Sequence, residues 1–217
     1  MPYDVECDLV PISSVSDAPI VLAANSETPY KSVKDIIATA KAKPGSIDIG
    51  IPGVGSISHL VLEWLALSTE TKLQHVPFKG GAPAVQALVS NVVPLGILAS
   101  STVTPHEKAG TLRVLAVTSA KRSKLNPEWP TLQEQGVADV NASNWTALFA
   151  PRGTPDAIVS KINGDVVKAL QSGDVKEKFA SGGVDVIPST PAELSARMKS
   201  ELAIFRTVIA KSGMQQE

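Results

Sequence analysis

Residues 47–59 read IDIGIPGVGSISH, and this stretch carries the pattern that decides the fold. Ile47, Ile49 and Ile51 stand at alternate positions and predict a β-strand. The glycine-containing segment 52–58 predicts a tight turn, and residues 59–68 have the apolar spacing of a helix. Strand, glycine turn and helix in this order are typical of α/β proteins.

The same order recurs along the rest of the chain. Further strands are expected at 15–24, 73–77, 95–98, 112–118 and 184–187, and further helices at 33–43, 82–89, 105–109, 155–170, 174–181 and after residue 190. Residues 145–150 form a further apolar run. Ser32 with Asp35 and Thr190 with Glu193 have capping-box spacing, and Thr154 is expected to cap the helix that follows it. Alternating strands and helices predict a sheet of mostly parallel strands.

Composition excludes several classes of function. The chain has 217 residues, 20 basic and 21 acidic side chains, and 43% hydrophobic residues, which is typical of a globular protein. A net charge of −1 gives no electrostatic reason to bind nucleic acid. Cys7 is the single cysteine, so an intrachain disulfide is excluded. No apolar run reaches the roughly 20 residues of a membrane-spanning helix, and no export signal is visible at the start.

The glycine turn at 53–59 is the most informative local feature. Glycines allow a ligand to approach the backbone closely, and the N–H groups at a helix N-terminus favour a negative charge. The turn lacks the third glycine of a dinucleotide site and the Gly-Lys-Ser/Thr ending of a P-loop. It therefore suits a carboxylate or a phosphate, with a tight turn that binds nothing as the alternative. A second turn, Lys79-Gly80-Gly81, opens the next helix in the same way, although Lys79 could equally be a solvated surface charge.

Candidate catalytic and metal-binding residues are few. Ser58 and His59 are adjacent, but neighbours on a helix point about 100° apart and do not form a dyad. His59 is therefore interpreted as a packing or supporting residue. Neither His75 nor His106 has a partner at metal-ligand spacing, so we expect no metal, no cofactor and no catalytic residue. The competing enzyme hypothesis is a hydrolase with Ser56 or Ser58 as nucleophile.

A series of motifs along nearly the whole chain resembles one known family. These motifs are Pro2-Tyr3-Asp4, Lys43-Pro44-Gly45, Gly53-Val54-Gly55-Ser56 with His59-Leu60, His75-Val76-Pro77-Phe78-Lys79-Gly80, Pro105-His106, Leu115-Ala116-Val117-Thr118-Ser119, Pro130-Thr131 and Gly153-Thr154-Pro155. In this order they are similar to the Bug family, also called the tripartite tricarboxylate transporter substrate-binding proteins.

The resemblance implies an α/β, periplasmic-binding-protein-like fold of type II, the Venus-flytrap type, with two lobes. It implies that 25–147 form a complete second lobe with the glycine-rich ligand turn, and that 1–24 and 148–217 are the remaining parts of the first lobe. Family members begin with a signal peptide and a first-lobe strand that this sequence does not contain. The chain is therefore expected to be truncated at its N-terminus, with an incomplete first lobe, and to be periplasmic although no signal peptide is visible.

The resemblance also implies a function. It predicts an extracytoplasmic solute-binding protein for small carboxylates or related polar metabolites that feeds a tripartite tricarboxylate-type transporter. The membrane subunits of that transporter and further copies of the chain are the expected partners. The predicted ligand-binding residues are Gly53, Gly55, Ser56, Ile57, Ser58, His59, Lys79, Gly80, Gly81, Ala99 and Ser100. The family's acidic position before its Pro-His motif is replaced here by Ile97-Leu98-Ala99-Ser100. A truncated interaction or remnant module without transport function is the alternative.

Overall fold

The computed structural model describes residues 4–214, so residues 1–3, where the resemblance begins, and 215–217 lie outside the described part. The chain divides into two compact units. Unit 1 comprises Met1–Asp17 and Trp145–Ile204, and unit 2 comprises Ala18–Asn144 and Phe205–Glu217. The assignment of 25–147 to one lobe of a larger receptor stays a prediction. None of the helices in the described part is long and apolar enough to cross a membrane.

The sheet of unit 2 is mixed, not mostly parallel as expected. Its strands are β1 (Leu9–Asn25, which begins in unit 1), β2 (Asp48–Ile51), β3 (Gln74–Pro77), β4 (Leu95–Ala99) and β5 (Leu112–Val117), in the order β3-β2-β4-β1-β5. β2 is parallel to β3 and β4, whereas β1 is antiparallel to β4 and β5. Alternation along the sequence does not fix which strands become neighbours, and β1 inserts between two strands that follow it much later.

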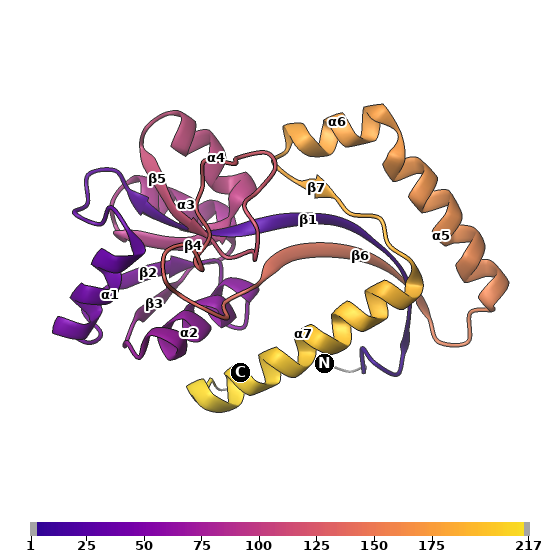
Figure 1. The fold of residues 1–217 in the computed structure, drawn as a ribbon, viewed down its shortest axis with the longest axis horizontal. Helices are drawn as coiled ribbons and strands as arrows, with labels where there is room; N and C mark the ends of the chain where they lie inside the picture. The colour runs from indigo at the N-terminus through magenta and orange to yellow at the C-terminus, as the bar shows by residue number, and fades with distance from the viewer. Residues whose placement is uncertain (1–3, 215–217) are drawn as a thin grey trace. The chain divides into compact units, whose positions relative to one another are not determined.

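Helices cover both faces of this sheet (Figure 1). They are α1 (Val33–Ala42), α2 (Ile57–Thr69), α3 (Gly81–Val89) and α4 (Ser100–Lys108). Side chains of β1 alternate between two apolar clusters: Ile20 and Leu22 pack in one, and Val21 and Ala23 in the other. The near-continuous apolar run of β1 follows from this burial on both faces. The predicted capping box at the start of α1 is confirmed, since Ser32 and Asp35 each accept the other's backbone N–H.

The segment after β5 belongs to the same unit. Leu132 N–H donates to the Val117 carbonyl oxygen, and the Thr118 hydroxyl donates to the Ala142 carbonyl oxygen at 2.6 Å. Trp129 is 2% exposed and packs in the core. The proline-containing segment is therefore held by the sheet rather than forming a free linker.

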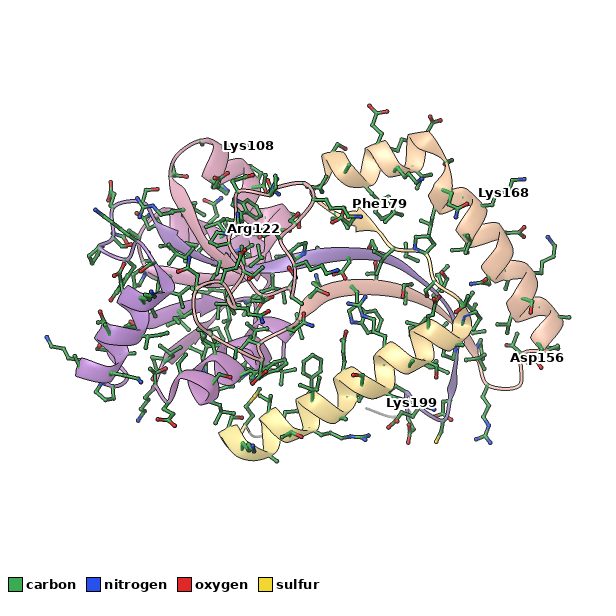
Figure 2. All side chains as sticks on the ribbon, viewed as in Figure 1. Lys108, Arg122, Asp156, Lys168, Phe179 and Lys199 are labelled. Atoms are coloured by element: carbon green, nitrogen blue, oxygen red, sulfur yellow. The ribbon has the colours of Figure 1, made fainter. Side chains whose placement is uncertain are left out.

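Unit 1 contains most of β6 (Ser143–Pro151, which begins in unit 2), β7 (Asp185–Val186), α5 (Asp156–Gln171), α6 (Gly173–Ser181) and most of α7 (Pro191–Ser212). Figure 2 labels Asp156 at the start of α5 and Lys168 near its end, a charge distribution that suits the helix dipole. The Thr190–Glu193 capping box is confirmed. The expected Thr154 cap is wrong: Pro155 is the N-cap residue, and the Thr154 hydroxyl donates instead to the Pro151 carbonyl oxygen.

Candidate functional site

Three helices begin at the same edge of the unit 2 sheet. β3, β2 and β4 are adjacent and parallel, so their carboxyl ends meet at one edge. Each strand is followed by a helix, α3, α2 and α4 respectively, so all three helix N-termini lie along this edge (Figure 1). The carboxyl edge of parallel strands is the usual place for ligands in α/β proteins, and helix N-termini favour anions. The predicted residues of the 53–59, 79–81 and 99–100 segments are therefore brought together at this edge.

The first turn is held by its own hydrogen bonds. Gly55 has a φ of +73°, and a Cβ there would have no atom within 4 Å, so the glycine is needed for its conformation and not for space. Ser56 is the N-cap residue of α2: its hydroxyl accepts the His59 N–H and donates to the Gly53 carbonyl oxygen at 2.7 Å. Ser58 is 2% exposed.

The backbone donors of this turn differ in availability. Gly55 N–H donates to His59 Nδ1 at 3.2 Å, and Ser56 N–H donates to the Gly53 carbonyl oxygen at 3.3 Å. Helix geometry leaves the first-turn N–H groups of Ile57 and Ser58 without intrahelical acceptors. The N–H groups of Ile57, which is half-buried, and of Ser58, which is buried, are therefore the donors that a carboxylate would meet without breaking a helix hydrogen bond. The Gly55 N–H becomes free only when the His59 ring is displaced.

The second turn is attached to the first. Gly80 N–H donates to the Pro52 carbonyl oxygen at 2.8 Å, and Phe78 N–H donates to the Ile51 carbonyl oxygen at 2.9 Å. Gly80 is the N-cap residue of α3, with a φ of +107° and no side-chain cap. Its helix therefore presents the Gly81 and Ala82 N–H groups without a competing side-chain acceptor.

The third helix also begins without a side-chain cap. Ala99 is the N-cap residue of α4, and Ser100 is 1% exposed. α4 starts five residues before the helix expected at 105–109, because Pro105 lies inside it and not at its start. A Cβ on Gly81 would lie 3.6 Å from the Thr102 methyl group, so the beginnings of α3 and α4 are in close contact.

Two histidines and a glutamate converge behind the first turn. His59 Nε2 lies 3.7 Å and His75 Nδ1 lies 3.9 Å from Glu63 Oε1, and the two imidazole centroids are 4.5 Å apart. Burial, and then the neighbouring His75, lower the pKa of His59 below its ordinary value. Burial raises the pKa of Glu63, and His75 opposes this rise.

This convergence was missed in the sequence. The expectation that His75 has no partner for metal binding was wrong, because it lies beside His59 and Glu63, which are four residues apart on one helix face. That spacing was the available signal. The position of His75 beside them depends on the pairing of β2 with β3, which the spacing does not reveal.

Comparison with known proteins agrees with this geometry. Residues 1–214 match the family described as tripartite tricarboxylate transporter family receptor. The chain belongs to this receptor family. Protein BugT of Bordetella pertussis is 36% identical over 213 residues, which are 98% of this chain but only 65% of BugT. The chain thus spans a little less than two thirds of the length of BugT.

Solved receptors have the same fold. A protein of R. palustris solved with adipate has a TM-score of 0.88 and 31% identity, and the match covers 99% of this chain and 72% of that one. MatC from Rhodopseudomonas palustris with bound malate has a TM-score of 0.83 and 27% identity, and covers 95% of this chain and 71% of MatC. The expected family and the periplasmic-binding-protein-like α/β fold are therefore confirmed.

Proposed function

We propose that this chain is the ligand-binding part of an extracytoplasmic receptor that captures small carboxylates for a tripartite tricarboxylate-type transporter. The observation that carries the proposal is the meeting of three helix N-termini, those of α2, α3 and α4, at the carboxyl edge of adjacent parallel strands. Two receptors of the same fold were solved with the dicarboxylates adipate and malate. A dicarboxylate is accordingly the ligand class proposed for this chain.

Electrostatics at this edge supports an anionic ligand. Each exposed helix N-terminus stabilises a negative charge by about 0.3–1 kcal/mol. A hydrogen bond from a backbone N–H to a charged oxygen contributes about 1.5–3 kcal/mol. Lys79, which precedes α3, is exposed and adds a positive charge at the same edge. Backbone donors recognise the carboxylate itself, so the side chains around the turns select the rest of the ligand.

The arrangement of the serines favours a receptor over a hydrolase. A nucleophilic serine needs a base within hydrogen-bonding distance of its hydroxyl. The Ser56 hydroxyl instead donates to the Gly53 carbonyl oxygen, and His59 Nδ1 accepts from Gly55 and not from a serine. Ser56 therefore acts as a helix cap, and we propose that the protein is not an enzyme.

The proposal extends to compartment and partners. A solved relative of 27% identity is described as the periplasmic binding protein BugD, which supports a periplasmic location. Membrane subunits of a tripartite transporter and further copies of this chain are the proposed macromolecular partners. Sedimentation across a range of protein concentrations tests self-association: an increase in mass with concentration supports it, and a constant monomer mass contradicts it.

Calorimetric titration with adipate and with malate tests the ligand class. Ala82 and Ala157 are both exposed alanines at the second position of a helix, on α3 and α5 respectively. Ala82→Asp and Ala157→Asp therefore make the same chemical change, favourable to each helix dipole. Two like charges about 4 Å apart in water repel by about 1 kcal/mol, so Ala82→Asp should weaken binding about fivefold.

The control variant Ala157→Asp should bind like the wild type. Equal affinities of wild type and Ala82→Asp would contradict placement of the carboxylate at this edge. Absence of binding to any small carboxylate would contradict the receptor function.

A further inference from the structure

His59, Glu63 and His75 form a compact set of potential metal ligands. His59 and Glu63 lie four residues apart on α2 and share one helix face, and His75 approaches them from β3. One ligand atom from each residue lies within 4.8 Å of the others. The set belongs entirely to unit 2 and lies behind the turn at 53–59.

The buried nitrogen of His59 is an independent indication of a ligand. His59 is 4% exposed, and its Nε2 is buried without a hydrogen-bond partner. His59 Nε2 lies 3.7 Å from Glu63 Oε1, which is too far for a hydrogen bond. A buried polar atom without a partner destabilises the fold, and a group bound between the three side chains would remove this cost.

The side chains of His59, Glu63 and His75 determine which kind of ligand fits between them. Two imidazole nitrogens and one carboxylate oxygen suit zinc and other first-row transition metals, whereas calcium and magnesium prefer oxygen ligands alone. Metal–ligand bonds of about 2.0–2.2 Å put tetrahedral ligands roughly 3.4 Å apart. Glu63 Oε1 lies 3.7 Å from His59 Nε2 and 3.9 Å from His75 Nδ1, so these two distances need to shorten only slightly for all three atoms to bind one metal ion.

We propose that His59 Nε2, Glu63 and His75 Nδ1 bind a divalent transition metal of the zinc type beside the ligand turn. Burial lowers the pKa of His59 and so favours the neutral imidazole that a metal requires. The His75 side chain is 36% exposed, which leaves an entry path and room for a water as fourth ligand.

Metal binding changes the hydrogen bonding of the turn. Because His59 Nδ1 accepts the Gly55 N–H, neutral His59 carries its proton on Nε2. A metal on Nε2 requires that proton to move to Nδ1, where it then faces the Gly55 N–H. Two donors cannot bond, so the Gly55 N–H is released from His59. If the proposed function holds, the released N–H becomes available to a carboxylate, and metal and carboxylate binding reinforce each other.

The metal alone is the first probe. Protein without a polyhistidine tag is treated with chelator, dialysed and titrated with Zn²⁺ by calorimetry and with Co²⁺ by visible absorption. Cys7 and His106 hold the remaining thiol and imidazole of the chain, so Cys7→Ser/His106→Ala is the matched control. We expect one metal per chain in the wild type and in this control, and at least about tenfold weaker binding in Glu63→Gln and His75→Ala.

Nitrogen NMR of the wild-type imidazoles gives a readout that does not depend on a variant folding. Zn²⁺ should shift the His59 and His75 nitrogens and leave those of His106 unchanged. Absence of stoichiometric binding, unchanged His59 and His75 nitrogens, equal affinity in wild type and both ligand variants, or loss of binding in the control would each overturn the site.

Titration of adipate with and without Zn²⁺ then tests the coupling, which predicts tighter adipate binding in the presence of the metal. Equal adipate affinities would overturn the coupling. If adipate and related acids fail to bind under either condition while Zn²⁺ binds, the proposed function fails and the metal site stands.

Discussion

The Gly80 N–H donates a hydrogen bond of 2.8 Å to the Pro52 carbonyl oxygen and so joins the two glycine turns of unit 2. This bond requires the chain at Gly80 to adopt a φ of +107° and a ψ of 175°. The conformation is essentially restricted to glycine. This backbone conformation at Gly80 therefore contributes, together with the pairing of β2 and β3, to the relative positions of the α2 and α3 N-termini.

Replacement of Gly80 should destabilise the protein. Gly80→Ala should lower the free energy of unfolding by about 1–3 kcal/mol, because a Cβ strains this conformation whatever the surrounding space. Gly81→Ala is the matched control, since its Cβ would make only an ordinary contact of 3.6 Å with Thr102. Urea unfolding of the two variants checks this expectation, and equal stabilities would contradict the conformational argument.

Removal of the α2 cap should destabilise the first turn. Ser56→Ala loses the hydroxyl that binds His59 N–H and the Gly53 carbonyl oxygen, and should cost about 0.5–2 kcal/mol. Ser56→Thr keeps a hydroxyl and should retain most of the stability. Thermal unfolding measures the stability of both variants. If Ser56→Thr is as unstable as Ser56→Ala, loss of the helix cap is not the cause of the destabilisation.

An indole hydrogen bond in unit 1 should contribute to stability. Trp145 Nε1 donates to Glu201 Oε2 at 2.7 Å, and Arg197 donates to the other carboxylate oxygen at 2.8 Å. Glu201→Ala removes both acceptors and should destabilise by about 1–3 kcal/mol. Glu201→Gln keeps an oxygen for the indole and should cost less. Denaturant unfolding followed by tryptophan fluorescence distinguishes the variants, and equal losses would show that the hydrogen bond is not the relevant contact.

Stability should depend on pH through Glu134. The Thr131 backbone N–H and the Arg122 side chain bind its carboxylate, and they lower its pKa from the usual 4.5. A lowered folded-state pKa means that the stabilisation is present above pH 4.5 and disappears as the pH falls through the folded-state pKa. The stability difference between wild type and Glu134→Gln should therefore shrink on acidification below that value. A constant difference in urea midpoint would contradict this assignment.

Local signals in the sequence predicted local structure well. Ser32 with Asp35 and Thr190 with Glu193 cap their helices as expected, because each capping box is complete within four residues. Thr154 failed as a cap because Pro155 itself takes the N-cap position. The segment from Ser100 was not recognised as helical because hydroxyl residues have low helix propensity and Pro105 suggested a start.

Features that depend on strand pairing were less predictable. The antiparallel direction of β1 and the approach of His75 to Glu63 both require knowledge of which strands are neighbours. The glycine turns were recognised from the sequence, but the hydrogen bond from Gly55 N–H to His59 Nδ1 was not. That bond leaves Ile57 and Ser58 as the donors of the first turn without an intrahelical acceptor.

Backbone amide NMR during titration with adipate or malate tests directly whether the helix N-termini of unit 2 bind a carboxylate, because it reports which N–H groups change on binding. We expect saturable shifts that are largest at Ile57, Ser58, Gly81 and Ala82, with Ala157 on α5 unchanged. Saturable shifts confined to residues away from the 53–59 and 79–82 turns, or no shift with any small dicarboxylate at millimolar concentration, would contradict this expectation.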